Sequence, residues 1–242
     1  MDIKALRSEL VTASHILAER GVVDAFGHVS TRDPDDAGRF LISRSLAPAL
    51  IGEADLMRID LDGEPLDDPR PAFLERFIHA AIYRARPEVM AVVHSHSPSV
   101  IPFGIVAGAP LRPTFHMCGF LGEGAPVFEI RDTAGDATDL LIRSNALGAA
   151  LAATLGQEAV ALMRGHGATV VGTTLRQAVF RAVYLEVGAR VQLQAAALGA
   201  PTFLTPAEAA AAAAANDGQV DRAWDLWASL VPESGRPMAS PR

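Results

Sequence analysis

Two histidines, His94 and His96, stand one residue apart directly after an apolar run, in the segment VVHSHSPSV (residues 92–100). The run predicts a β-strand, and residues two apart on a strand project from the same face. Side chains about 6–7 Å apart along a strand could converge on one metal ion with bonds of about 2.0–2.1 Å. The alternative interpretation is a pair of polar residues on a half-exposed strand.

A third histidine, His166, lies between two glycines, and apolar segments that predict strands flank this triplet on both sides. Glycine adopts backbone angles that other residues avoid, so the chain could turn sharply here and present the imidazole inward. The alternative is a turn histidine that points into solvent. The buried character expected of both flanking strands favours the inward orientation.

A carboxylate, Glu75, is flanked by Phe73, Leu74, Phe77 and Ile78 in AFLERFI (residues 72–78), on a helix expected just before the His-x-His strand. Such a carboxylate either reaches water or faces a site, where it could act as a metal ligand or a general base. His79 is one turn further along, and we expect it to be a core histidine rather than a partner of the site. Three histidines and one carboxylate, with one coordination position open, are typical of a catalytic metal site.

The elements that must position these residues follow from periodicity and from turn residues. Helices are expected at Ile3–Leu17 (ending at Gly21), 72–86, 136–156, 175–199 and 206–216, and strands at 39–44, 89–97 and on both sides of the turn in 159–172. Loops are expected at 24–34, at 60–72, at 99–125 (with short strands) and over the last ten residues, which should lie in solvent. No repeat or linker divides the chain, so we expect one layered α/β domain over residues 1–242, in which 206–242 form an Ala-rich helix and a tail.

Composition restricts the class of protein. Half of the 242 residues are apolar and a fifth are charged, which is ordinary for a globular protein with one core. No apolar run reaches the roughly 18 residues that span a bilayer, and the acidic residues near the N-terminus are unlike a signal peptide. The single cysteine, Cys118, excludes an internal disulfide, and the net charge of −7 disfavours nucleic acid. We therefore expect a cytoplasmic protein that binds a small molecule, without nucleic-acid or membrane partners.

The ordered set of Glu75, VVHSHSP (residues 92–98) and LMRGHGATVVG (residues 162–172) resembles the class II aldolase/adducin family, over the chain from the first helix to about residue 205. The resemblance implies a three-layer α/β/α fold with a largely antiparallel central sheet, and a homotetramer with active sites between subunits. It also implies that His94, His96 and His166 bind a divalent metal and that Glu75 is the acid/base residue. Zinc or manganese is the expected metal, with iron or cobalt as alternatives.

Two departures from the family's sugar-phosphate aldolases bear on the substrate. Their phosphate-binding Gly-Asn-Leu-Ser turn and Ser-Ser pair are replaced here by GHVS (residues 27–30) and PAFLE (residues 71–75). The tyrosine that protonates the leaving carbon in those enzymes is absent from RPTFHMCGF (residues 112–120), where His116 stands. The chain resembles more closely the branch that contains decarboxylases of hydroxylated aromatic acids, including 3,4-dihydroxyphthalate and the pyridine dicarboxylate of vitamin B6 degradation.

The function predicted from this resemblance is a metal-dependent carbon–carbon lyase. It would decarboxylate a hydroxylated aromatic or heteroaromatic acid through a metal-stabilised enolate or carbanion, with His116 or Glu75 protonating the ring. One alternative is a class II-type aldolase acting on an unphosphorylated hydroxy-keto acid or sugar derivative. Another is a non-catalytic, adducin-like interaction module.

An acidic hydroxy-carboxylate substrate needs polar partners in the protein. Arg44 and Arg112 are candidates for binding a carboxylate, and the alternative for each is an ordinary surface arginine. His28 lies in the turn that holds phosphate in the sugar enzymes, so it is a third candidate for contact with the substrate.

Overall fold

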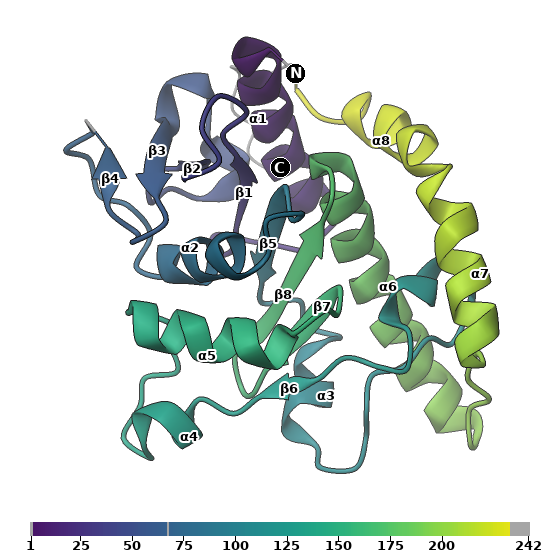
Figure 1. Cartoon of the computed structure of the whole chain (residues 1–242). Coiled ribbons are helices and arrows are strands. Elements are labelled where there is room, and N and C mark those ends of the chain that lie inside the picture. Colours follow the sequence, from purple (N-terminus) through teal and green to yellow (C-terminus); the bar gives the residue numbers. More distant parts are fainter. Residues whose placement is uncertain (1, 67, 233–242) are drawn as a thin grey trace.

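The computed structural model describes residues 2–66 and 68–232 and contains one sheet of eight strands, in the order β4-β3-β2-β1-β5-β8-β7-β6 (Figure 1). The strands are β1 (His28–Arg32), β2 (Arg39–Ser43), β3 (Leu56–Asp60), β4 (Pro65–Leu66), β5 (Ala91–Ser95), β6 (Val127–Phe128), β7 (Val160–Met163) and β8 (Gly167–Gly172). Only β6 and β7 pair in parallel among these strands, and every other neighbouring pair is antiparallel. The prediction of a largely antiparallel sheet is confirmed.

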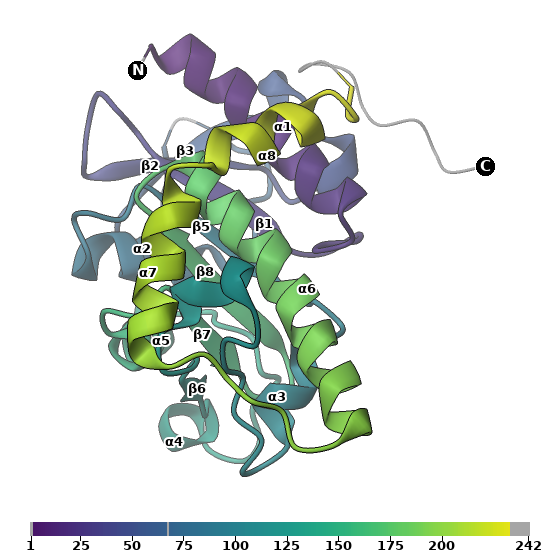
Figure 2. The same cartoon turned by 90° about the vertical axis from the view of Figure 1, so that its right-hand side faces the viewer.

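Helices cover both faces of this sheet and complete a three-layer α/β/α arrangement (Figures 1 and 2). The helices are α1 (Ile3–Glu19), α2 (Arg76–Ala85), α3 (Ile101–Ile105), α4 (Arg131–Ala134), α5 (Asn145–Leu155), α6 (Leu175–Leu198), α7 (Pro206–Asp217) and α8 (Val220–Ala228). One core contains side chains of α1, α6 and α8, and the other contains side chains of α2 and α5. Figure 2 shows α6 and α7 in front of the sheet. No helix among these described residues is long and apolar enough to cross a membrane.

The two cores follow from the alternation of side chains along each strand. On β2, Phe40 and Ile42 belong to the core beneath α2 and α5, whereas Leu41 belongs to the core beneath α1 and α6. On β5, Val92 and Val93 divide in the same way. Because His94 is two residues after Val92, it faces the α2 side of the sheet. The sheet therefore presents this histidine to the helix that follows Glu75.

Two helices begin later than the sequence predicted. The helix expected from residue 72 begins at Arg76, so Glu75 immediately precedes it. The helix expected from residue 136 begins at Asn145, where the Ser144 side chain accepts a hydrogen bond from the main-chain N–H of Leu147. The apolar spacing continues before both helix starts. The residues there are nevertheless not helical, and they contribute polar groups to the candidate site described below.

Three regions expected to be loops contain regular structure. Residues 24–34 include β1, which has five buried residues because it lies between β2 and β5. Residues 60–72 include β4, which lies at the sheet edge, where a proline is tolerated. Residues 99–125 form α3 and a 3-10 helix (His116–Leu121) instead of short strands.

The C-terminal region was predicted correctly only in part. The Ala-rich helix α7 begins with the reciprocal hydrogen bonds of a capping box between Thr205 and Glu208. The following segment, predicted to be part of a tail, forms α8 because Trp224 and Trp227 are buried in the core beside α1 and α6. The last ten residues lie outside the described part of the chain, so their expected exposure stays a prediction.

The approach of α2 to α5 depends on Gly148, and this gives a testable prediction. A Cβ atom at Gly148 would overlap the carbonyl oxygen of Phe77 and the Cβ of Ala81 on α2. We expect Gly148→Ala to lower the free energy of unfolding by about 1–3 kcal/mol, as overpacked cores do. Urea denaturation followed by circular dichroism would measure it. Gly218→Ala is the control, because a Cβ there meets only Ala215 O at an ordinary 3.5 Å. Equal effects of the two substitutions would contradict the prediction.

Candidate metal centre

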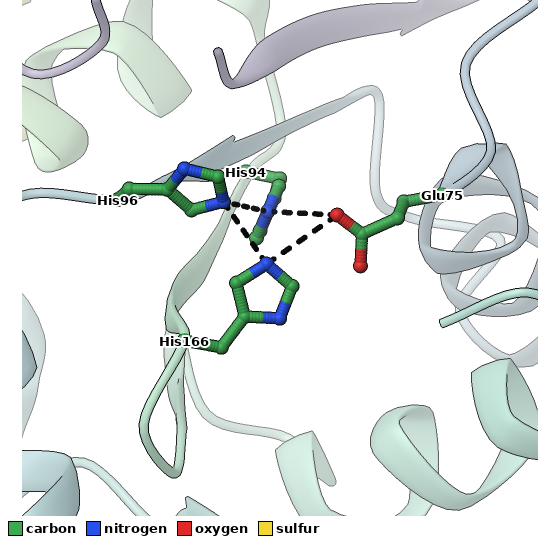
Figure 3. Close-up of side chains that lie close together, drawn as sticks. All are labelled: Glu75, His94, His96 and His166. Atoms are coloured by element: carbon green, nitrogen blue, oxygen red, sulfur yellow. Dashed lines mark hydrogen bonds and ion pairs between the residues drawn. The ribbon is translucent and has the colours of Figure 1, made fainter. Parts of the chain in front are cut away.

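The structure brings together four side chains that are far apart in the sequence: Glu75, His94, His96 and His166 (Figure 3). The Nε2 atom of His96 lies 3.2 Å from Nε2 of His94 and 2.9 Å from Nε2 of His166. An oxygen of Glu75 lies 3.5 Å from Nε2 of His94 and 3.4 Å from Nε2 of His166. The four potential ligand atoms all lie within 4.8 Å of one another.

These side chains come from the ends of elements rather than from their middles. His94 is the second-last residue of β5, and His96 follows the last residue of that strand. His166 occupies the turn between β7 and β8, and Glu75 precedes α2. The sequence placed His96 on a strand and Glu75 on a helix. The end positions allow the side chains to converge, because the backbone has left the regular path there.

Two glycines hold the His166 turn against β5. Gly165 has a φ of +66°, in the left-handed region that glycine adopts without strain. A Cβ at Gly167 would overlap the carbonyl oxygen of Ser95 and would lie 3.2 Å from Cα of His96. The two strands can therefore approach closely enough for their histidines to meet. This agrees with the sharp inward turn expected from the sequence.

Main-chain carbonyls fix the protonation of two of the rings. Nδ1 of His94 lies 3.2 Å from the oxygen of Ala168, and Nδ1 of His166 lies 2.9 Å from the oxygen of Leu140. Because a carbonyl oxygen can only accept, Nδ1 must carry the proton in both rings. When the rings are neutral, the lone pairs of the two Nε2 atoms face the centre, which is the arrangement of metal-binding histidines.

The loop before α5 supports the site in a way that the sequence did not indicate. The carbonyl of Leu140 accepts from His166, and the N–H of Ile142 donates to Oε1 of Glu75 at 2.9 Å. Leu140 has a φ of +68°, a conformation that costs a non-glycine residue roughly 1–3 kcal/mol. The apolar run around it looks helical, so no local signal identified this loop.

The electrostatics of the site favour a cation. Burial alone would raise the pKa of Glu75, but the neighbouring His94 and His166 more than offset this effect, so its pKa is lowered and the carboxylate is ionised. Burial, together with repulsion from His94 and His166, lowers the pKa of His96 to about 4. One ionised carboxylate and three imidazoles form a suitable donor set for a divalent metal.

The spacing of the donors provides a separate test of fit. Ligand atoms bonded at about 2.0–2.1 Å to one tetrahedral ion lie roughly 3.3–3.4 Å from one another. Of the six pairs among the four donor atoms, four are separated by 2.9 to 3.5 Å, and the other two lie within 4.8 Å. The four donor atoms are therefore close enough together to bind a single divalent cation after small adjustments of the side chains.

A cavity of about 510 Å³ opens beside this centre. Its lining residues are Ala25, Phe26, Gly27, His28, Ser45, Leu46, Ala47, Phe73, Leu74, Glu75, His96 and Leu141. The wall is mostly apolar, with two aromatic rings, and its polar groups are few. A larger cavity of about 670 Å³ lies among residues of α1, α6 and α8 and contains none of the four donors. We place the candidate site at the smaller cavity because only it adjoins the donor set.

The other predicted substrate-binding and catalytic residues lie in different places. His28 lines the cavity, and its ring centroid is 5.1 Å from that of His94. The guanidinium of Arg44 binds Asp55 at 2.7 Å, and that of Arg112 lies over a phenylalanine ring at 4.5 Å. His116 is exposed at the start of its 3-10 helix. Among the described residues of one chain, the cavity lining includes His28 but not these two arginines or His116.

His79 is fully buried, as expected for a core histidine, but it also has polar partners. Its Nε2 lies 2.7 Å from Nδ1 of His28, and its Nδ1 lies 2.6 Å from Oγ of Ser30. The structure therefore connects His79 to the cavity wall through His28. The sequence contained a signal for this connection, since His79 is four residues after Glu75 and lies on the same face of α2.

Comparison with known proteins gives a consistent result. The chain matches the Class II Aldolase and Adducin N-terminal domain family over residues 8–193. It is 38% identical to "Decarboxylase tropJ" of Talaromyces stipitatus, over 93% of both chains. It is 33% identical to the 3,4-dihydroxyphthalate decarboxylase of Terrabacter sp. strain DBF63, over 86% of this chain and 88% of that one.

Solved structures agree with this family assignment. L-fuculose 1-phosphate aldolase from Glaciozyma antarctica PI12 superposes with a TM-score of 0.78 and 29% identity, over 97% of this chain and 92% of that one. An aldolase II superfamily protein from Pseudomonas syringae has the same fold, with a TM-score of 0.76 and 24% identity over 94% of this chain and 92% of that one. The chain therefore belongs to the class II aldolase/adducin family, on the branch that contains the 3,4-dihydroxyphthalate decarboxylases.

Proposed function

We propose that this protein is a divalent-metal-dependent decarboxylase of a hydroxylated aromatic or heteroaromatic carboxylic acid. The observation that carries the proposal is the meeting of three imidazole nitrogens and the Glu75 carboxylate beside a cavity with aromatic walls. Similarity to proteins named as decarboxylases over most of the chain supports the same reaction class.

In this proposal, His94, His96 and His166 hold the metal, and Glu75 lies close enough to add a fourth ligand. A divalent cation, when bound, supplies a Lewis acid that stabilises negative charge on substrate oxygens. Imidazole and carboxylate donors suit zinc or manganese, with iron or cobalt as alternatives. The carbonyls bonded to His94 and His166 occupy Nδ1 of each ring, so Nε2 is the atom left to bind the metal.

The cavity suits a flat apolar body with its polar groups at one end. Phe26 and Phe73 could contact the faces of an aromatic ring, while the hydroxyl and the reacting carboxylate point toward the histidines. Glu75 would accept the proton of the substrate hydroxyl. The bond between the ring carbon and the carboxylate then breaks, CO₂ leaves, and the electron pair stays on the ring carbon. That carbon then receives the proton that Glu75 accepted.

The assembly proposed for this enzyme is a homotetramer in the cytoplasm, with active sites between subunits. The side chains of Phe26 and Leu74 at the cavity are 66% and 56% exposed in one chain, as expected of a surface that a neighbouring subunit covers. Arg44, Arg112 and His116 would then approach the cavity of a neighbour, where His116 is a second candidate for protonating the product.

An aldolase remains the second candidate, because the L-fuculose 1-phosphate aldolase superposes on nearly the whole chain. The apolar wall of the cavity offers little to a sugar phosphate, so this alternative applies to an unphosphorylated substrate. A non-catalytic interaction module has no need for four converging metal donors, and their presence argues against it.

The reaction can be tested with a panel of benzene and pyridine hydroxy-carboxylates. We expect release of CO₂ from at least one of them, abolished by a chelator and restored by zinc or manganese. Hydroxy-keto acids in the same panel serve as the control for aldol cleavage. Release of an aldehyde without CO₂ would favour the aldolase instead.

Metal content can be tested separately from activity. We expect His166→Ala to lose most of the bound metal measured by mass spectrometry, because two histidines remain where three converged. Decarboxylation should fall in parallel. His116→Ala is the matched control, since this exposed histidine lies outside the cluster, and it should retain the metal. Equal metal content in both variants would contradict the assigned ligands.

The role of Glu75 can be separated from that of the metal ligands. Glu75→Gln keeps a similar shape and the three histidines, so we expect it to retain most of the metal. Turnover should fall by about 10²–10⁴-fold, the usual contribution of a positioned acid/base group. Steady-state kinetics at a fixed metal content would measure the loss. Full turnover in this variant would show that Glu75 is not the acid/base residue.

A further inference from the structure

A row of four buried polar groups extends from the cavity wall into the protein. Nδ1 of His28 lies 2.7 Å from Nε2 of His79, and Nδ1 of His79 lies 2.6 Å from Oγ of Ser30. Oγ of Ser30 lies 2.8 Å from the hydroxyl of Tyr83. All four residues are buried, and the exposed fraction is 5% for His28 and at most 1% for the others. Polar groups this deep are retained only when their hydrogen bonds are satisfied.

The elements that build the metal centre also position this row. In the pairing of β1 with β5, His28 lies opposite His94, so the two rings are neighbours. On α2, His79 and Tyr83 follow Glu75 at intervals of four residues and share its face. Ser30 is two residues after His28 on β1 and faces the same helix.

The proton order along the row can be worked out from its buried end. Burial raises the pKa of Tyr83, so the phenol keeps its proton. Its hydroxyl has Ser30 as its side-chain hydrogen-bond partner among the described residues. The phenol proton is therefore donated to Ser30, because a buried donor without an acceptor is costly.

The remaining bonds follow in sequence. Burial lowers the pKa of His79 to about 3, so this ring is neutral. A neutral imidazole has one donor and one acceptor nitrogen. Ser30 accepts from Tyr83 and so donates to Nδ1 of His79. His79 then donates from Nε2 to Nδ1 of His28, and the only proton left on His28 is at Nε2.

We infer that His28 determines specificity by presenting a fixed Nε2–H donor to the cavity, where it binds an acceptor oxygen of the ligand. His79 and Ser30 are positioning residues that set the direction of this donor. Nε2 of His28 has no hydrogen-bond partner among the described residues, and the residue lines the cavity. An uncharged donor can lie beside a bound cation without repulsion. That the oxygen belongs to a hydroxy-carboxylate rests on the proposed function, whereas the donor direction does not.

A neutron crystal structure of the whole protein after hydrogen–deuterium exchange, at pH 7, tests the proton order directly. We expect deuterium on Nε2 of His28 and of His79, and on Oγ of Ser30 pointing toward His79. Deuterium on Nδ1 of His28 would overturn the inference. This measurement does not depend on turnover, so failure to decarboxylate any acid would leave its result unchanged.

Binding of salicylate to the zinc-loaded protein, measured by calorimetry, tests the consequence for a ligand. We expect Ser30→Ala to weaken salicylate binding about tenfold, because Nδ1 of His79 loses the hydrogen bond that Ser30 donates. His79 is then not held in one tautomer, and neither is His28. Thr31→Ala is the matched control: this buried hydroxyl is next on the same strand and bonds Met90 on the other side. It should bind salicylate as the unmodified protein does.

Two substitutions of His28 itself keep the test decisive if Ser30→Ala does not fold. His28→Gln retains an N–H donor and should bind salicylate at least fivefold more tightly than His28→Phe, which has none. Equal affinities in these two variants, with equal zinc content, would overturn the role assigned to His28. Tight binding without CO₂ release would count against the proposed reaction but would leave this inference standing.

Discussion

The contact between the end of β5 and the turn before β8 is the constraint on which the site depends. Gly167 allows the two segments to touch, and the carbonyl of Ala168 then accepts the outer proton of the His94 ring. The same contact brings His166 within 2.9 Å of His96. Backbone geometry thus decides both where the imidazoles lie and which nitrogen of His94 carries its proton. The convergence of the candidate donor atoms is a consequence of strand packing.

The remaining parts of the site reinforce this arrangement from the other side of the centre. The loop before α5 holds Glu75 through Ile142 and holds His166 through Leu140. Leu140 has a strained backbone conformation, and the hydrogen bonds from this loop to two site residues accompany that strain. Glu75 immediately precedes α2 and His79 lies one turn later on it, so one short helix positions residues of both the centre and the buried polar row.

The sequence was informative where chemistry and local geometry coincide. The spacing of His94 and His96 and the glycines around His166 indicated that the three imidazoles converge. The periodicity of apolar residues likewise indicated helices and strands that contribute to the two cores. It was uninformative where tertiary contacts override local pattern. The segment 136–144 has apolar residues at helical spacing but serves the site through its main chain. Strand β1 looked like a polar loop, because the hydrogen-bond partners of its His28 and Ser30 side chains lie on α2, about fifty residues away in the sequence.

The origin of the cavity wall has a consequence for how such an enzyme can diversify. The four donors are fixed by strand ends, a tight turn and a helix start, whereas the wall comes largely from three connecting segments that contain Phe26, Leu46 and Phe73. Loops tolerate exchange far better than packed strands do. The shape of the cavity can therefore change, in evolution or by engineering, through exchange of these segments while the four converging side chains stay in place. One framework can thus carry cavities of many shapes.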